Sequence, residues 1–200
     1  MIRVQVTDRL VAEAQQLLGD SYGTTSYAPS WKKNADYKEE HLLLGAIGEI
    51  AVIDYCWSND LLAYKHQANV SDIQLHSGHT IEVKTQRCST APNMNYKVNF
   101  GSRNKQTERS DFCFFNRVQF VAGKPEAVWL LGGCSWDKFF RMATFHHQGD
   151  PMIDIDDNGL MTNTGRYFST DCYDLAISSL APPSAALKHF KSLQQKEEAT

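Results

Sequence analysis

The chain has little of what stabilises small secreted proteins or anchors a protein in a membrane. Among its 200 residues there are five scattered cysteines and no CxxC pair, so neither a disulfide framework nor a zinc site is indicated. No stretch approaches the roughly 18 consecutive apolar residues of a transmembrane helix. Residues 1–5 lack the apolar region of a secretory signal, and a cytoplasmic location without membrane association is therefore expected.

The chain also lacks a general excess of positive charge, which argues against a protein that coats nucleic acid. Its net charge is −3, but the segment from Lys84 to Lys124 holds eight basic and two acidic side chains, a local balance of +6. Such polarisation fits a protein with one phosphate-facing surface. Charge runs often only solvate a surface, so a function has to come from the chemistry of particular residues.

Hydrophobic periodicity predicts an α/β chain. The first expected helix follows Thr7, its N-cap, and ends at Leu18, before Gly19. Further helices are expected over 36–57, 135–143 and 184–196. The expected strands are 2–6, 62–66, 70–75, 80–86, 112–121, 127–131 up to Gly132-Gly133, and one strand or helix near 173–180. Loops or turns are expected over 21–34, 87–110 and 149–165.

A β-hairpin is indicated by two alternating stretches, 71–75 and 80–86, which flank a turn that contains Gly78. The apolar residues of both stretches should share a buried face, because a one-residue slip would expose one set. This places Ile73 opposite Ile81. It also requires a turn of odd length or a bulge, since a two-residue loop gives the wrong parity.

The same register gathers charged residues on the other face of the hairpin. Asp72 lies opposite Glu82, and Lys84 follows two residues along the strand. Two neighbouring carboxylates repel each other, and a divalent cation relieves that repulsion. Mg²⁺ favours one or two carboxylates plus water, while a lysine can orient the water or stabilise developing charge. These side chains are the minimum equipment for metal-assisted hydrolysis of a phosphodiester. The structural alternative is that Lys84 only neutralises Glu82.

A fourth acid, Glu49, lies on an apolar face of the predicted 36–57 helix, among small residues. Such an acid should be partly buried and needs a partner. Gly45 and Gly48 each cost about 1 kcal/mol relative to alanine inside a helix. A close approach of the helix to the sheet would offset that cost and bring Glu49 to the other carboxylates.

The order of a helical Glu49, then Asp72, nine residues, and Glu82-Val-Lys84 resembles the PD-(D/E)xK nucleases, and Gly45 to Glu49 resembles their first motif. Ser71 stands in place of the name-giving proline. The resemblance covers about residues 38–131, which also look like small phage-encoded nucleases. It implies an α/β, restriction-endonuclease-like core, with a central mixed sheet of four to five strands flanked by helices.

By this resemblance Asp72, Glu82 and Glu49 bind Mg²⁺, for which Mn²⁺ can substitute, and Lys84 serves the water or the phosphate. Gln86 resembles a glutamine found in some members and joins the expected catalytic set. One nuclease-like domain is expected over 1–182, with an N-terminal helical extension over 1–35 and the catalytic core over 36–131. Residues 183–200 are expected to form a polar C-terminal helix or tail.

The implied partner is DNA, cleaved by a metal-activated water that leaves a 3′-hydroxyl and a 5′-phosphate, with endonuclease action expected. The host cytoplasm is the implied location if the chain is phage-encoded, and a homodimer is left open. Basic and aromatic residues suited to backbone contact and base stacking are Arg87, Tyr96, Lys97, Arg103, Lys105 and Arg109.

Three alternatives remain open from the sequence. The first is a Holliday-junction resolvase or another structure-selective nuclease. The second is a site-specific endonuclease of homing or restriction type. The third, of a different class, is a DNA-binding module that keeps the fold without cleaving.

Overall fold

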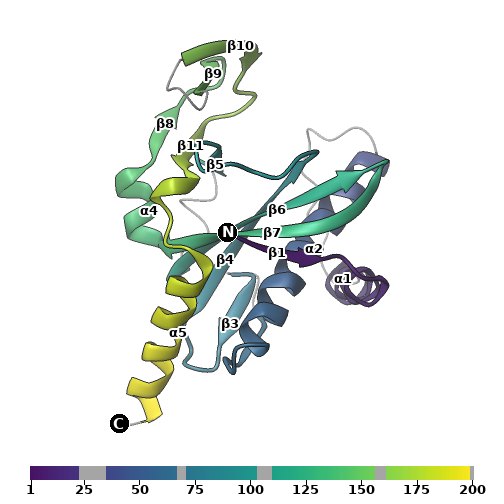
Figure 1. The fold of residues 1–200 in the computed structure, drawn as a ribbon, viewed down its shortest axis with the longest axis vertical. Coiled ribbons are helices and arrows are strands. Elements are labelled where there is room, and N and C mark those ends of the chain that lie inside the picture. Colours follow the sequence, from purple (N-terminus) through teal and green to yellow (C-terminus); the bar gives the residue numbers. More distant parts are fainter. Residues whose placement is uncertain (23–34, 67–70, 103–109, 156–160, 199–200) are drawn as a thin grey trace.

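A six-stranded mixed sheet forms the centre of the fold (Figure 1). The computed structural model describes residues 1–22, 35–66, 71–102, 110–155 and 161–198. The strand order is β1-β7-β6-β4-β3-β2, with β4 and β6 parallel and the other neighbours antiparallel. These strands are β1 (Ile2–Gln5), β2 (Ala63–Lys65), β3 (Ile73–Leu75), β4 (Thr80–Cys88), β6 (Phe112–Val121) and β7 (Lys124–Ser135).

The α/β class is confirmed, but the described sheet has six strands instead of the predicted four to five. Each of the six strands falls on a stretch predicted as a strand, and the short strands β1 and β2 form the two edges of the sheet. β7 is also longer than predicted and continues through Gly132-Gly133 to Ser135. Both glycines lie close to neighbouring backbone, at the carbonyl oxygens of Ala181 and Cys113, so they permit close packing without ending the strand.

Helices flank the sheet, and their bounds are α1 (Asp8–Tyr22), α2 (Ala35–Trp57), α4 (Trp136–Met142), α5 (Pro183–Glu198) and the short 3-10 helix η1 (Ile177–Ser179). Thr7 begins α1 as predicted, since its Oγ1 accepts a hydrogen bond of 3.3 Å from Leu10 N. Gly19 does not end α1, because one glycine costs a helix only about 1 kcal/mol. None of the described helices combines the length and apolar character needed to span a membrane.

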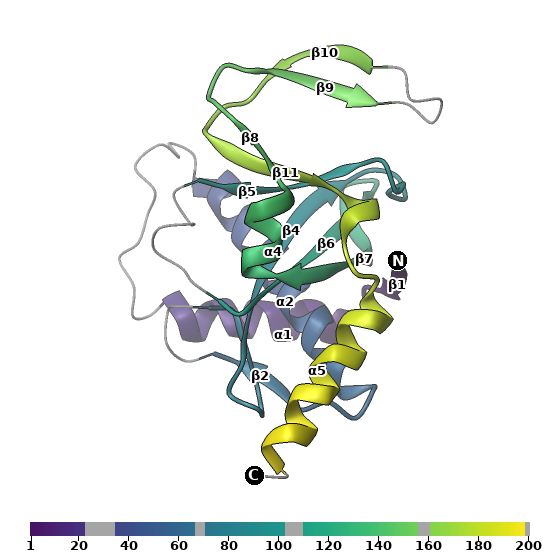
Figure 2. The same ribbon diagram turned by 90° about the vertical axis from the view of Figure 1, so that its left-hand side faces the viewer.

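Two smaller sheets lie beside the main one (Figure 2). One has the order β5-β11-β8, and the other is a hairpin; their strands are β5 (Lys97–Gly101), β8 (Thr144–His146), β9 (Pro151–Ile155), β10 (Met161–Tyr167) and β11 (Cys172–Ala176). The loop prediction for 87–110 is therefore wrong at β5, and the turn prediction for 149–165 is wrong at β9 and β10. The β5 strand exists because β11, a distant part of the chain, pairs with it.

Both faces of the central sheet are covered by hydrophobic clusters. Successive residues of β6 point to opposite faces, so Phe114 belongs to a first cluster with α1 and α2, whereas Phe115 belongs to a second cluster with β5, β11 and α4. A charged side chain in the middle of the neighbouring strand β4 is therefore covered by one of these two clusters, whichever face of the sheet it points to.

The C-terminal helix is not a detached polar tail. Ala186, Leu187 and Phe190 of α5 are buried in the first cluster, and the Phe190 ring lies 5.0 Å from the Phe112 ring. Pro183 begins the helix, and these apolar residues give it an inner face that packs on the sheet.

Helix α2 approaches the sheet closely at Gly48. A Cβ atom at this position would lie 2.0 Å from Thr85 Oγ1 and 2.7 Å from Asn116 Oδ1. Asn116 Nδ2 donates a hydrogen bond of 3.2 Å to Gly48 O. The predicted close approach is thus confirmed at Gly48. At Gly45 a Cβ atom would meet nothing within 4 Å, and packing does not explain that glycine.

A pair of alanine substitutions tests this contact. Gly48→Ala should lower the free energy of unfolding by about 1–3 kcal/mol, because the added methyl group overpacks the space beside Thr85 and Asn116. Gly45→Ala should raise it by about 0.5–1 kcal/mol through helix propensity. Urea unfolding of both variants is the measurement, and equal effects of the two substitutions would contradict the proposed contact.

Candidate active site

The 71–86 hairpin has the register that the apolar pattern predicts. Ile73 pairs with Ile81 and Gln74 with Thr80, so five residues, an odd number, lie between the last pair. Asp72 lies just before the paired residues of β3, and its Oδ2 accepts a hydrogen bond of 2.8 Å from Val83 N. The Asp72 side chain thereby joins the backbone of β4, and its carboxylate is held in place.

Glu82 and Lys84 lie on the face of β4 opposite to the buried Ile81 and Val83. Only 4% of the Glu82 side chain is exposed, and its carboxylate forms an ion pair with the Lys84 ammonium group. Lys84 Nζ also lies 4.7 Å from the centre of the Phe100 ring, over its face. A buried carboxylate of this kind is tolerated because a charged partner is hydrogen-bonded to it.

The long helix α2 brings Glu49 to the same place. Glu49 Oε2 forms an ion pair with Lys65 Nζ, which comes from β2, and Lys65 Nζ lies 3.9 Å from Asp72 Oδ1. Lys65 therefore lies between the helix acid and the hairpin acid. We call the five residues Glu49, Lys65, Asp72, Glu82 and Lys84 the acid–lysine cluster.

Lys65 was not among the site residues predicted from the sequence. The only signal for it was its place at the end of the predicted 62–66 strand, beside the hairpin that carries Asp72. Lysines at strand ends are common, and the pairing of β2 with β3 is what brings this one to the acids.

The pKa of Glu49 is raised to about 7, mainly by burial and then by the neighbouring Asp72 carboxylate, although Lys65 and Lys84 act in the opposite direction. Burial also lowers the pKa of Lys65, but the carboxylates of Glu49 and Asp72 more than offset this, and its pKa is raised overall. These mutual effects show that the acids and lysines form one electrostatic network. When all five groups are ionised, three carboxylates face two ammonium groups, which leaves an excess of negative charge.

The donor set suits a hard divalent cation in chemistry and charge, because carboxylate oxygens are the ligands that Mg²⁺ prefers. A cation would also relieve the repulsion that contributes to the raised pKa of Glu49. Within the described ranges, no three His, Cys, Asp or Glu side chains are arranged around one point as a ready metal site. Lysines hold the Glu49 and Glu82 carboxylates instead, so a metal ion would have to share or replace these ion pairs.

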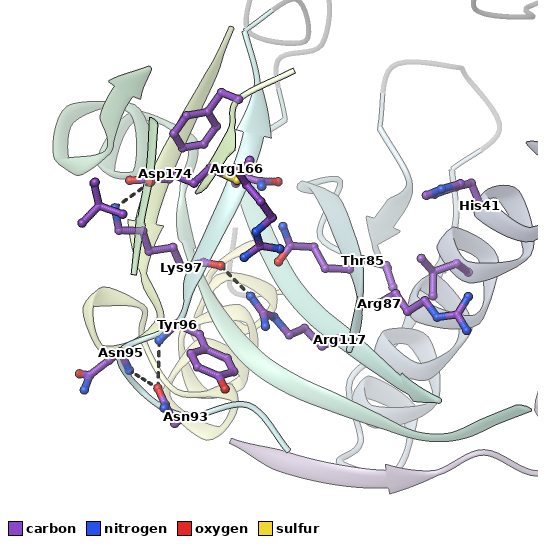
Figure 3. A pocket seen from close by; sticks show the side chains of 16 residues that line it. His41, Thr85, Arg87, Asn93, Asn95, Tyr96, Lys97, Arg117, Arg166 and Asp174 are labelled. Carbon is purple, nitrogen blue, oxygen red and sulfur yellow. Dashed lines mark hydrogen bonds and ion pairs between the residues drawn. The ribbon is translucent and has the colours of Figure 1, made fainter. Parts of the chain in front are cut away.

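A pocket of about 850 Å³ is lined in part by Thr85, Gln86 and Arg87 of β4, the three residues after Lys84, and Figure 3 shows its lining side chains. Four of the predicted residues line it: Gln86, Arg87, Tyr96 and Lys97. Gln86 follows Lys84 by two residues, and its Oε1 is buried without a hydrogen-bond partner among the described residues. The other predicted DNA contacts, Arg103, Lys105 and Arg109, lie outside the described residues.

This pocket is also lined by two arginines that were not among the site residues predicted from the sequence. Arg117 comes from β6 and Arg166 from β10. Arg117 Nη2 donates a hydrogen bond of 2.8 Å to Lys97 O, and burial lowers the pKa of its guanidinium. Arg117 belongs to the basic segment from Lys84 to Lys124, whereas Arg166 lies outside that segment. The β9–β10 hairpin brings Arg166 to the pocket.

Comparisons of the chain with protein-family models, with curated proteins and with solved structures gave no match. The function therefore has to be argued from the acid–lysine cluster and the pocket themselves.

The raised pKa of Glu49 predicts a pH dependence of stability. With a pKa of about 7 in the folded chain against 4.5 for an ordinary glutamate, the folded state binds the proton more tightly than the unfolded state. The resulting stabilisation is complete below about pH 4.5 and is lost as the pH rises through 7, by up to about 3 kcal/mol.

Glu49→Gln should remove this loss, because a neutral amide replaces the buried carboxyl group. Urea unfolding between pH 5 and pH 8, in EDTA, is the measurement, and Glu13→Gln on the exposed part of α1 is the matched control. The same slope in wild type and Glu49→Gln would show that Glu49 is not the group that titrates.

Proposed function

We propose that this chain is a Mg²⁺-dependent DNA nuclease of the PD-(D/E)xK type, with a restriction-endonuclease-like core. The observation that carries the proposal is the meeting of Glu49 with Asp72, from a helix and a hairpin, next to the Glu82–Lys84 pair. The order and chemistry of these residues are those of the nuclease motif. An endonuclease is the form that we favour, with Mn²⁺ as an expected substitute for Mg²⁺.

A purely structural role for the acid–lysine cluster is a weaker explanation. Buried ion pairs contribute little net stability, because desolvation offsets much of their attraction. Here the acids also outnumber the lysines, and Glu49 is held where its charged form is disfavoured. A site that keeps such an arrangement under the cover of two hydrophobic clusters is better explained by chemistry that needs the negative charge.

Each residue of the cluster then has a role. Asp72, Glu82 and Glu49 would hold Mg²⁺, which supplies an activated water and neutralises charge on the phosphate. Asp72 is preset for this role because Val83 N fixes one of its carboxylate oxygens and leaves the other directed toward Lys65. Lys84 would orient the attacking water or stabilise the charge that develops on the phosphate. Lys65 would hold the Glu49 carboxylate in position.

The first test is the cleavage of supercoiled plasmid and of single-stranded DNA with Mg²⁺. Wild type should cleave, and Lys84→Ala and Asp72→Ala should each lose about 100-fold or more in rate, since both remove groups that act on the reacting phosphate. Lys124→Ala is the matched control, because Lys124 is an exposed lysine at the start of β7. EDTA should abolish the activity.

The outcomes separate the alternatives. Equal activity in all variants would mean that the cluster is not the active site. Binding of DNA without a metal-dependent product would favour the non-catalytic module, preferential cleavage of a four-way junction would favour the resolvase, and discrete bands from a long DNA would favour a site-specific enzyme.

A second test reads metal binding directly. At pH 8, Mg²⁺ should raise the free energy of unfolding of wild type by about 2.7 kcal/mol at a concentration of about 100 times its Kd. Asp72→Asn should lose most of this gain, because it removes a charged ligand, and Asp137→Asn on α4 serves as a control acid. Calorimetric unfolding with Mg²⁺ and with EDTA is the measurement, and the same gain in both variants would place the ion elsewhere.

A further inference from the structure

The pocket beside the acid–lysine cluster has the size of a small-molecule site. Its volume of about 850 Å³ falls within the roughly 300–1,000 Å³ that such sites occupy. A DNA duplex, whose major groove alone is about 12 Å wide, does not enter a space of that size. A single unpaired nucleotide is small enough to enter it.

The walls of the pocket are basic. Arg87, Lys97, Arg117 and Arg166 line it, and Asp174 is the one carboxylate among the lining residues that the structure describes. Asp174 Oδ2 lies 2.9 Å from Lys97 Nζ and 2.9 Å from His146 Nε2, so the ammonium group of Lys97 offsets its negative charge. Arginine is suited to phosphate because its planar group forms paired hydrogen bonds.

An aromatic surface lies next to these charges. Tyr96 is 37% exposed, and the Arg117 guanidinium lies 5.1 Å from the centre of its ring. The backbone around Tyr96 is fixed, since Asn93 Oδ1 accepts a hydrogen bond of 3.1 Å from Tyr96 N and Ile177 N donates one of 2.8 Å to Tyr96 O. An aromatic ring on a fixed backbone, beside a cation, is a platform for stacking a base.

Polar groups that can read or orient a base complete the pocket. The exposed amides of Asn95 and Asn99 line it, and an amide offers both a donor and an acceptor. The Oε1 of Gln86 and the Nε of Arg117 are buried in the pocket region and have no hydrogen-bond partner in the described parts of the chain. A ligand with both donors and acceptors would complement the exposed amides of Asn95 and Asn99.

Two elements, β4 and α2, carry residues of both the pocket and the acid–lysine cluster. Gln86 lies about 6.6 Å beyond Lys84 along β4, at about 3.3 Å per residue. Leu44 and His41 line the pocket from α2, about one and two turns before Glu49. In Figure 3, His41 and Arg87 lie on the side of the pocket away from Tyr96.

We propose that this pocket binds one unpaired nucleotide of a single-stranded DNA segment, with its base against Tyr96 and its phosphate on Arg117 and Arg166. The inference rests on the proposed nuclease function, since the bound nucleotide would belong to the strand that reaches the acid–lysine cluster. It makes single-stranded segments, whether free strands, flaps or ends, the preferred substrates, because a paired nucleotide cannot enter without leaving its stack.

Binding measurements test the pocket without requiring catalysis. We would follow the fluorescence anisotropy of a short labelled single strand, and of its duplex, in EDTA. Wild type should bind the single strand more tightly than the duplex. Tyr96→Ala should weaken single-strand binding by about 5- to 100-fold through lost stacking. Arg166→Ala should weaken it by roughly 3- to 10-fold and reduce the dependence of log K on log salt by about 0.7, the value for one phosphate contact.

Arg141→Ala is the matched control, because Arg141 is an exposed arginine of α4 that does not line the pocket. Arg166 is itself exposed, so its variant should fold, and urea unfolding checks this. Duplex binding as tight as single-strand binding, or unchanged binding by Arg166→Ala, would overturn the proposal. A free deoxynucleoside monophosphate that displaced the strand at equal concentration would overturn the assignment to a strand.

The nuclease proposal and the pocket proposal can fail separately. Selective binding of single strands that depends on Tyr96 and Arg166, without cleavage in Mg²⁺, would support the pocket and refute the nuclease. Cleavage that depends on Asp72 and Lys84, with binding unaffected in the pocket variants, would refute the pocket alone.

Discussion

The contact of helix α2 with the sheet at Gly48 is the constraint on which the candidate site depends. With no side chain at this position, the helix backbone lies against Thr85 and Asn116, and the Asn116 amide donates to the Gly48 carbonyl oxygen. Glu49 is the next residue of the helix. Its distance from Asp72 is therefore set by how closely the helix can approach β4, and a bulkier residue at Gly48 would move the acid away from its partners.

The cluster that results is costly to maintain. Glu82 is almost fully buried, and Glu49 is covered well enough for its charged form to be disfavoured. Such groups are shielded from solvent on either face of the sheet, because one hydrophobic cluster packs on each side of it. Lys65 and Lys84 reduce the electrostatic cost, but they leave more carboxylates than ammonium groups. This residual negative charge is the physical basis for the proposal that the cluster holds a cation, which would in turn attract a phosphate.

The pocket depends on contacts between distant parts of the chain. β5 supplies Lys97, and its pairing with β11 puts this lysine beside Asp174. The β9–β10 hairpin adds Arg166. The basic surface of the pocket is thus shared between a strand inside the predicted 87–110 loop and a hairpin much later in the chain. The same assembly orders Tyr96 through a backbone hydrogen bond to η1.

The amino-acid sequence by itself determined the parts of the site that depend on local periodicity. The alternation of apolar residues set Ile73 opposite Ile81 and put Asp72 near Glu82, because a shifted register would have exposed one apolar set. Only the tertiary structure brought Lys65 to Glu49 and Arg166 to the pocket. These features arise from pairing and packing between segments far apart in the chain, whose energies no local pattern records.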